Sequence, residues 1–346
     1  MTLEAASKGL GKTERILLAH GSGGELSHEL VASLFVKVFM NPYLAPLDDM
    51  AVLRIGERQV AFTTDSYVVT PIFFPGGDIG RLAVCGTVND LAMGGARPLF
   101  LSAGFIIEEG FPLASLEKIV ISMQETAVES GVKIVTGDTK VVNRGGADQV
   151  FINTAGIGIL PEGVSISGSL AQPGDRILLS GTVGDHGVAV LSCREGLGFS
   201  STLTSDCAPL NHLVAGMLEV SPAIRCLRDP TRGGLSSTLN ELARQSGVGL
   251  WVREERIPMK EEVRGACELL GLDPLTLANE GKLVAIVAPE AAEKILRAMH
   301  AHPLGRDAAI IGEVREEPRG KVVLRTAIGS TRLMDMLVGE PLPRIC

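Results

Sequence analysis

Residues 78–107, DIGRLAVCGTVNDLAMGGARPLFLSAGFII, decide the class of fold. The apolar spacing of residues 78–95 predicts a helix, and the pair Gly94 and Gly95 should end it. The apolar run over 100–107 then predicts a strand that follows the helix after a short turn. A helix that leads directly into a strand is typical of mixed α/β domains.

The rest of the chain repeats this alternation of helices and strands. Residues 25–40 place apolar side chains on one helical stripe, and Asn41 and Pro42 should end that helix. Gly131 should close a helix over 113–130. The further strands expected are 60–64, 132–137, 150–159, 176–181, 248–253, 283–288, 308–314 and 321–326, and the further helices are 209–220, 234–246, 259–271 and 290–301.

Length and local composition together predict two domains. At about 150 residues for each domain, 346 residues correspond to two. The segment 161–175 is rich in Gly, Ser and Pro and is the expected boundary. We therefore predict an N-terminal domain at 1–162, a C-terminal α/β domain at 163–338, and an extended, mobile tail at 339–346 that carries Cys346.

The composition excludes several classes of protein. With 45% hydrophobic and 21% charged residues the chain should be globular, and a net charge of −8 argues against nucleic-acid binding. Neither a secretory signal nor a run of about 20 apolar residues that could span a membrane is visible. The six cysteines contain no C-x-x-C pair, so we expect no zinc site and assign all but Cys346 to packing. We expect a soluble, cytoplasmic protein.

Acidic residues beside glycines are the main indication of function. They occur in LDDM (47–50), TTDS (63–66), VNDLAMGG (88–95), TGDTK (136–140) and DPTRGG (229–234). Asp65 and Asp138 are each expected at the end of a strand, on the rim of the sheet where ligands usually bind. Taken singly, each Asp is better explained as a cap or turn residue. Taken together, they indicate a magnesium nucleotide, because Mg²⁺ is commonly held by one or two carboxylates and substrate phosphates.

Two glycine segments could supply phosphate contacts. HGSGG (20–24) precedes a predicted helix, and Gly233 and Gly234 open another helix beside Arg232. Exposed N–H groups at a helix N-terminus can hold phosphate. In contrast, AASKGLGKT (5–13) only imitates a P-loop, because Ala6 stands where that motif needs glycine and no strand precedes it.

These segments carry a family resemblance. HGSGG, LDDMA, TTDS, VNDLAMGGARP, TGDTKV, DPTRGG and NEGKL appear in the order seen in the aminoimidazole ribonucleotide (AIR) synthetase-like, or PurM-like, ATP-binding superfamily. Within it the chain most closely resembles the carbamoyl dehydratase (HypE) family of hydrogenase maturation. The ending PRIC (343–346) is similar to that family's C-terminal signature, and the resemblance extends from about residue 17 to the end.

The resemblance implies a fold and a reaction. Members are two-domain α/β proteins that form homodimers through the sheets of their N-terminal domains and bind ATP between the domains. A partner carbamoyltransferase, HypF, would place a carbamoyl group on Cys346. ATP-dependent dehydration would convert this S-carboxamide into an S-cyanide. The cyanide would pass to iron on a HypC–HypD scaffold, for the Fe(CN)₂CO centre of [NiFe] hydrogenases.

The same resemblance implies roles for single residues. Cys346 would carry the carbamoyl group, Lys140 would meet the γ-phosphate or the developing oxyanion, and Glu280 would act as the base or orient the amide. The implied metal ligands are Asp48, Asp65, Asp90 and Asp229. The implied nucleotide contacts add Asp49, Asn89, Gly137, Asp138, Thr139, Arg232 and Gly233.

Other functions fit part of the sequence. A synthetase of the same superfamily that acts on a free small molecule would explain the acidic motifs but gives no role to the PRIC ending. A non-catalytic carrier would explain the terminal cysteine but has no need of the acidic residues. A selenophosphate-forming relative is disfavoured because HGSGG contains no reactive cysteine. Whether the tail would enter the cleft of its own chain or of a partner chain stays open.

Overall fold

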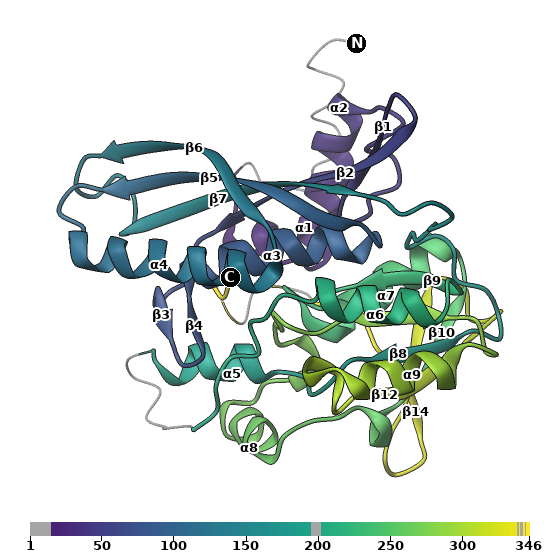
Figure 1. Cartoon of the computed structure of the whole chain (residues 1–346). Coiled ribbons are helices and arrows are strands. Elements are labelled where there is room, and N and C mark those ends of the chain that lie inside the picture. The colour runs from purple at the N-terminus through teal and green to yellow at the C-terminus, as the bar shows by residue number, and fades with distance from the viewer. Residues whose placement is uncertain (1–14, 195–201, 338, 340–341, 343) are drawn as a thin grey trace.

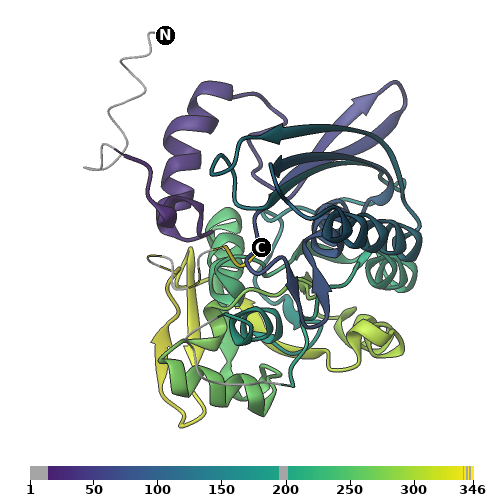
Figure 2. The same ribbon diagram turned by 90° about the vertical axis from the view of Figure 1, so that its left-hand side faces the viewer.

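The computed structural model describes residues 15–194, 202–337, 339, 342 and 344–346. Within these residues the chain forms two layered α/β halves that pack against each other (Figures 1 and 2). The segment AASKGLGKT lies outside the described residues. The predicted two-domain mixed α/β architecture is confirmed.

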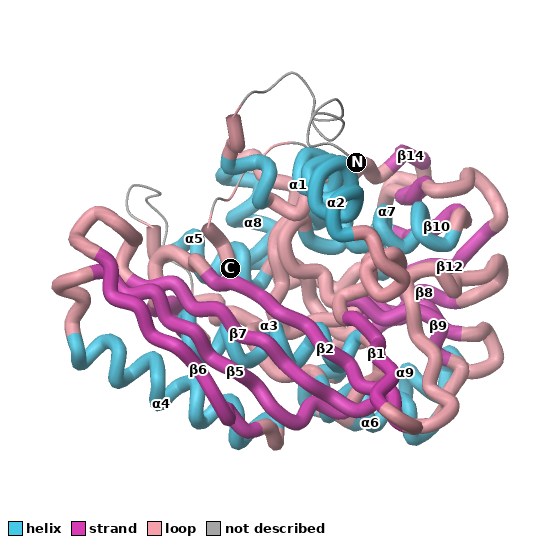
Figure 3. The backbone as a smooth tube through the Cα atoms, turned by 90° about the horizontal axis from the view of Figure 1, so that it is seen from above, coloured by secondary structure: helices cyan, strands magenta, loops and turns pink. Residues whose placement is uncertain are grey.

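The N-terminal half is a five-stranded sheet with helices on one face. In spatial order its strands are β1 (Ala51–Ile55), β2 (Arg58–Tyr67), β7 (Val150–Ile159), β5 (Arg97–Glu108) and β6 (Lys133–Val142). Neighbouring strands are antiparallel except β5 and β6, which are parallel. Helices α3 (Ile79–Met93) and α4 (Leu113–Ser130) cover the same face of this sheet, as Figures 1 and 3 show.

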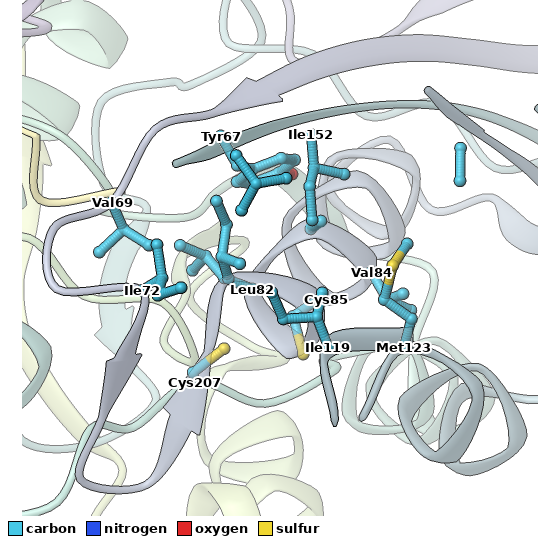
Figure 4. Packing of buried hydrophobic residues seen from close by; sticks show 14 of the residues in the cluster. Tyr67, Val69, Ile72, Leu82, Val84, Cys85, Ile119, Met123, Ile152 and Cys207 are labelled. Atoms are coloured by element: carbon cyan, nitrogen blue, oxygen red, sulfur yellow. The ribbon is translucent and has the colours of Figure 1, made fainter. Parts of the chain in front are cut away.

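Local sequence signals explain where these helices begin and end. The Asp78 side chain accepts hydrogen bonds from the N–H groups of Gly80 and Arg81 and so caps α3. Gly131 adopts a left-handed conformation with φ of 72° and ends α4, as predicted. The core between sheet and helices is apolar (Figure 4), and its side chains include Leu82, Val84, Ile119, Met123 and Ile152.

The opposite face of the same sheet is uncovered. Phe62, Phe100 and Ile157 are 40%, 44% and 43% exposed on it. Ile157 lies opposite both phenylalanines in the strand register, so the three side chains form one apolar row. Such a row on an open sheet is a candidate surface for association.

The C-terminal half is a seven-stranded mixed sheet. In spatial order its strands are β14 (Thr331–Leu333), β13 (Lys321–Arg325), β10 (Gly249–Arg253), β12 (Ala309–Arg315), β8 (Arg176–Leu179), β11 (Val284–Val287) and β9 (Ile224–Arg228). All residues of β11 are buried, because helices cover both faces. Val284 and Ile286 pack in a cluster with α7 (Gly234–Ser246), and Ala285 and Val287 pack in a cluster with α6 (Asn211–Val220) and α9 (Ala292–Ala301).

Helix α3 connects the two halves. Its residues Leu82 and Val84 belong to the N-terminal core, whereas Ala92 and Met93 pack with Leu210 of the C-terminal half. Residues 161–175 form no helix or strand and link β7 to β8. The smaller elements are α5 (Asp185–Ser192), α8 (Glu261–Leu270), the hairpin β3 (Phe73–Phe74) and β4 (Gly77–Asp78), and the short turns Leu18–Gly21, Glu254–Arg256, Pro274–Thr276 and Pro303–Gly305.

The helix expected at 25–40 is present, but its apolar stripe is largely uncovered. It begins as α1 (Glu25–Leu30), widens over Val31–Val36 and ends as α2 (Lys37–Phe39). Leu30 is buried, whereas Phe35 and Val38 are 44% and 54% exposed. Within one chain, therefore, the apolar stripe of this helix is only partly buried.

Two strand ends were predicted wrongly. Strand β2 continues past Asp65 to Tyr67, and β6 runs through Gly137 and Asp138 to Val142. Gly137 lies within the strand and not at its end, and a Cβ at this position would lie 2.2 Å from the main-chain oxygen of Ala103 on β5. The glycine permits a close approach of two parallel strands. Strands β1, β9 and β14 had no clear signal in the sequence.

Candidate active site

A polar cavity of about 240 Å³ lies between the two halves. The end of β2 and helix α3 bound it from the N-terminal half. Strand β9, the loop after it and helix α7 bound it from the C-terminal half. The cavity brings together these predicted site residues: Asp49, Asp65, Asp90, Asp229, Arg232, Glu280 and Cys346.

Strand geometry explains how Asp65 reaches the cavity. Alternate residues of β2 point to the same face, so Thr63, Asp65 and Tyr67 all face helix α3. The Tyr67 hydroxyl donates to Asp65 Oδ2 at 3.1 Å. The Thr63 hydroxyl lies 2.9 Å from Asp90 Oδ2 on α3 and donates to it. These hydrogen bonds hold two carboxylates toward the same space.

The carboxylates crowd one another. Burial raises the pKa values of Asp90 and Asp229 well above the usual range, and nearby carboxylates raise both further. Burial likewise raises the pKa of Asp65. It also raises the pKa of Asp49 to about 6, although the Arg228 charge opposes this shift. A site of this kind favours either protons or a bound cation.

Arg228 supplies a buried positive charge at the edge of this cluster. Its Nε lies 3.0 Å from Asp49 Oδ1, and its Nη1 lies 2.5 Å from Glu241 Oε2. Its Nη2 donates to the main-chain oxygen of Leu47 at 2.9 Å. Glu241 in turn contacts His28 Nε2 at 2.8 Å. The network ties the first helix, the segment before β1 and helix α7 to one arginine.

The two glycine segments meet beside the cavity. The Arg232 guanidinium donates to the main-chain oxygen of Gly21 at 2.9 Å. Gly23 has φ of 72°, and a Cβ on it would lie 2.7 Å from the main-chain oxygen of Arg232. Gly233 has φ of 79° and precedes α7. An adjoining space of about 190 Å³ is lined by Arg232, Gly233 and Cys346, among others.

The end of the tail lies inside this cleft. Val68 N–H donates to the main-chain oxygen of Cys346 at 3.3 Å, and Thr70 N–H donates to that of Arg344 at 3.1 Å. The tail thus pairs antiparallel with the segment that follows β2. Ile345 is 5% exposed and belongs to the N-terminal core cluster. The predicted mobility of the tail stays a prediction, because the described residues show one seated arrangement.

The Cys346 thiol faces Glu280. Burial raises the pKa of this thiol above its usual range; the Arg232 charge opposes the shift, and the Glu280 carboxyl adds to it. Burial also raises the pKa of Glu280 well above its usual range. Glu280 Oε1 has no hydrogen-bond partner among the described residues. The seated thiol is therefore protonated near neutral pH, and the carboxyl beside it has an oxygen available to a substrate.

A buried ion pair positions Glu280. Asp206 Oδ1 accepts from the Glu280 N–H at 3.0 Å, and Asp206 Oδ2 accepts from Lys282 Nζ at 3.1 Å. Asp206 is 3% and Lys282 12% exposed, so water screens this pair weakly. The main chain at Glu280 is thereby fixed.

Several predicted site residues lie elsewhere in the single chain. Asp48 Oδ1 accepts from the Gly168 N–H at 2.9 Å and does not line the cavity. The Asn89 amide bonds to the main chain of Ala208 and Leu210 and ties the halves together. Outside the cavity, on the edge strand β6, lie Gly137, Asp138, Thr139 and Lys140.

Lys140 faces away from its own cleft. Its side chain is 67% exposed and lies 2.7 Å from Asp138 Oδ2. It is in register with Ile106 of β5, which is 45% exposed. Lys140 therefore lies on the open face of the sheet that also carries Phe100.

Sequence reasoning missed four residues that shape the site. Arg228 directly precedes the DPTRGG motif, and His186 lies in the first turn of α5, in the sequence GDHG (184–187), so each has a nearby glycine signal. Asp206 and Glu241 have none, because only the fold brings them to the cleft. One packing assignment was also wrong: Cys193 is exposed, whereas Cys85, Cys207, Cys226 and Cys267 are buried as expected.

Among the residues that the structure describes, no group of three His, Cys, Asp or Glu side chains is arranged to hold a metal ion by itself. In the same part of the chain, none of the helices is long and apolar enough to cross a bilayer. The four aspartates that line the cavity still fit Mg²⁺, since this ion usually takes one or two carboxylates and completes its shell with phosphates and water.

The fold and the interdomain cleft define a protein of the AIR synthase-related class. The family model described as "AIR synthase related protein, N-terminal domain" matches residues 47–160, and that for the C-terminal domain matches residues 172–325. "Carbamoyl dehydratase HypE" from Azotobacter vinelandii is 57% identical over 329 residues, with 95% of this chain and 96% of that protein covered. The chain belongs to the carbamoyl dehydratase HypE family, as the motif order predicted.

Solved structures agree with this membership. HypE in a "HypE-HypF complex" superposes with a TM-score of 0.85 at 52% identity and covers 89% of this chain and 99% of its own. HypE "in complex with ATP" gives a TM-score of 0.81 at 53% identity and covers 96% of this chain and 100% of its own.

Proposed function

We propose that the chain is an ATP-dependent carbamoyl dehydratase that acts on its own C-terminus. It converts an S-carboxamide on Cys346 into an S-cyanide and so supplies cyanide for the Fe(CN)₂CO centre of [NiFe] hydrogenases. One observation carries this proposal. The terminal thiol, the carboxyl of Glu280 and a cluster of buried carboxylates line the same cavity. Family membership supports the same reaction.

The chemistry needs a group that activates an amide oxygen. That oxygen is a poor leaving group until it is phosphorylated. Transfer of the γ-phosphoryl of ATP to it, followed by loss of phosphate and two N–H protons, converts –S–C(=O)NH₂ into –S–C≡N and gives ADP and phosphate. A base within reach of the nitrogen is required. Glu280 fits this role in its ionised form: burial raises its pKa and so makes the carboxylate a stronger base, and its Oε1 has no hydrogen-bond partner among the described residues.

We assign ATP and Mg²⁺ to the acidic end of the cavity. Asp65, Asp90 and Asp229 would hold Mg²⁺, which would neutralise the phosphates during transfer. Asp49 would support them from beside Arg228, and Arg232 and Gly233 would face the phosphates. Asp48 and Asn89 would act indirectly, because their side chains brace the contact between the two halves.

The tail must leave the cleft to be loaded. The thiolate is the nucleophilic form of cysteine, and the seated thiol has a raised pKa. Carbamoylation by HypF therefore takes place with Cys346 outside the cavity, and dehydration with Cys346 inside it. A complex of HypE with HypF among close structural relatives supports HypF as a partner. A HypC–HypD scaffold would receive the cyanide, in the cytoplasm.

A homodimer would complete the site. The open sheet face presents the row Phe62, Phe100 and Ile157, which a second copy would cover. Lys140 and Asp138 lie on the same face. Pairing of two such faces would bring these residues next to the second chain, where Lys140 could meet the γ-phosphate.

One experiment tests the function directly. The protein is incubated with HypF, carbamoyl phosphate and ATP–Mg²⁺, and the mass of the C-terminal peptide is followed. We expect a carbamoyl adduct on Cys346 that loses one water only when ATP is hydrolysed at this protein. A Cys346→Ala variant should bind ATP and form no adduct. An unmodified Cys346 together with turnover of a free small amide would instead identify a synthetase, and an adduct that never loses water would identify a carrier.

A further inference from the structure

Each main-chain oxygen of the last three residues has its own donor. Thr70 N–H and Arg194 Nη2 donate to the oxygen of Arg344 at 3.1 and 2.9 Å, and Val68 N–H donates to that of Cys346. In an antiparallel pair, alternate residues turn their carbonyls away from the partner strand. The oxygen of Ile345 is turned away in this manner, and a buried carbonyl needs a donor. His186 Nε2, at 2.8 Å, provides it.

The surroundings of His186 fix which nitrogen carries the proton. The side chain is fully buried on α5, and the ring lies edge-on to Phe74 with 5.4 Å between centroids. A carbonyl oxygen only accepts, so Nε2 must carry the hydrogen. Burial lowers the pKa of His186, so the ring is neutral near pH 7. Nδ1 then accepts from the Ser205 hydroxyl at 2.8 Å.

The same short segment also holds Glu280. Ser205 Oγ accepts from the Cys207 N–H at 3.0 Å. Between these residues, Asp206 accepts from the Glu280 N–H and pairs with Lys282. Residues 205–207 thus connect the group that fixes the tail to the group that fixes Glu280. The position of Cys346 relative to the Glu280 carboxyl depends on this connection.

We propose that His186 is a positioning residue for the dehydration: by holding the Ile345 carbonyl, and through Ser205 the segment that orients Glu280, it sets the place of the modified Cys346 against the base. The proposal rests on the proposed function for its catalytic part only. The seating of the tail by His186 is independent of the reaction.

Two substitutions separate the contacts of His186. In His186→Asn the amide reaches about the place of Nδ1, so the Ser205 contact can persist while the Ile345 contact is lost. In His186→Gln the amide N–H reaches about the place of Nε2 and can still donate to Ile345. A matched control is His212→Asn, because His212 Nε2 also contacts a main-chain oxygen, that of Glu129 at 3.1 Å, in an exposed place outside the cleft.

The first measurement is the alkylation rate of Cys346 in the unmodified protein. It is followed on the C-terminal peptide by mass, because the exposed Cys193 will also react. Loss of one buried hydrogen bond should raise the rate about 3- to 10-fold in His186→Asn. His186→Gln and His212→Asn should stay within about twofold of the wild-type rate.

The second measurement starts from protein loaded by HypF. On addition of ATP–Mg²⁺, dehydration should be at least about 10-fold slower in His186→Asn, as expected for a misplaced reacting group, and largely recovered in His186→Gln. Loading by HypF should not slow in either variant. If wild-type protein is loaded but never dehydrates, the proposed function is wrong. The alkylation rates then still test whether His186 seats the tail.

Two results would overturn the proposal. One is a His186→Asn chain that alkylates and dehydrates at wild-type rates. The other is an equal defect in His186→Asn and His186→Gln, which would reduce His186 to a packing residue. Should His186→Asn fail to fold, as judged by thermal unfolding, Ser205→Ala is the second variant: it removes the hydroxyl that fixes the tautomer of His186, together with the contact of that hydroxyl to the Cys207 N–H. It should raise the alkylation rate of Cys346 about 2- to 5-fold, and an unchanged rate would reject the proposal.

Discussion

Arg228 and Asp49 form an ion pair across the two halves of the molecule, with 3.0 Å between Nε and Oδ1. The same guanidinium binds Glu241 and the main-chain oxygen of Leu47. One buried arginine therefore offsets two buried carboxylates and holds the segment before β1 in place. Both the stability of the cleft and its charge depend on this residue.

Removal of Arg228 should destabilise the protein strongly. Arg228→Gln leaves Asp49 buried without a counter-charge and Glu241 with His28 as its remaining partner, and such losses cost about 3–5 kcal/mol. The free energy of unfolding in urea measures the effect. Arg176→Gln is the control: the Arg176–Glu313 pair is 42% and 35% exposed, so its loss should cost less than about 1 kcal/mol. Equal effects at both sites would contradict the role given to burial.

Neutralising one carboxylate of the cluster should, in contrast, raise the free energy of unfolding. Asp229 is 7% exposed, and burial raises its pKa well above the usual range. The native state thus holds a proton that the unfolded state releases, and stability falls as pH rises through the raised pKa. Without nucleotide and magnesium, Asp229→Asn should be more stable than wild type by about 1–2 kcal/mol near pH 8.

The pH dependence distinguishes this cause from others. The advantage of Asp229→Asn should shrink as the pH falls and vanish below about 4, where the wild-type carboxyl becomes protonated in the unfolded as well as the native state. ATP–Mg²⁺ should raise the melting temperature of wild type but not of the variant, because the variant loses a metal ligand. The exposed Asp307→Asn should change neither quantity. An advantage that is constant with pH would contradict the assigned cause.

Glu280 should be needed for dehydration but not for loading. Glu280→Gln removes the base while keeping the shape of the side chain, and dehydration should fall about 10²- to 10⁴-fold. The C-terminal peptide should then accumulate as the carbamoyl adduct. The Cys346 thiol should also react faster with alkylating agents, because Glu280 contributes to its raised pKa. Glu268→Gln, on the exposed side of α8, is the control.

Lys140 should act in the cleft of a second chain. Lys140→Ala and Glu280→Gln chains, each inactive alone, can be co-expressed with different tags and purified as mixed dimers. Each mixed dimer contains one site with both residues intact if the lysine acts across the dimer, so about half of the wild-type activity should return. A lysine that acts within its own chain would give no activity in the mixture. The outward direction of Lys140 favours the first result.

Much of the fold could be predicted because its signals are local. Asp78 caps α3 and Gly131 ends α4 through contacts within one turn, so each helix end is visible in the sequence. Gly137 was misread because its reason is tertiary: only the main chain of Ala103 shows why the strand needs glycine there. Likewise, the apolar spacing over residues 25–40 predicts a buried helix face and gives no sign that Phe35 and Val38 are exposed.

The site was predicted only in part, because some of its residues lie in recognisable local motifs and others do not. Asp65, Asp90, Asp229, Glu280 and Cys346 come together from segments that carry recognisable motifs. Asp48 was ranked above Asp49 because adjacent carboxylates look alike in sequence, whereas only Asp49 lines the cavity beside Arg228. The role of Asp206 depends on packing across the chain, which no local pattern reports.

The seated tail changes how the rate of this protein should be described. The reacting group is attached to the same protein that transforms it, so each active site has one such group. The dehydration rate therefore shows no saturation with the concentration of this substrate. As long as the dimer stays intact, dilution should leave the dehydration step untouched, because it is first order in loaded protein. Free analogues must compete with a tethered group whose local concentration is on the order of millimolar, so weak ones will fail. The output of cyanide is then controlled by how often each chain is reloaded.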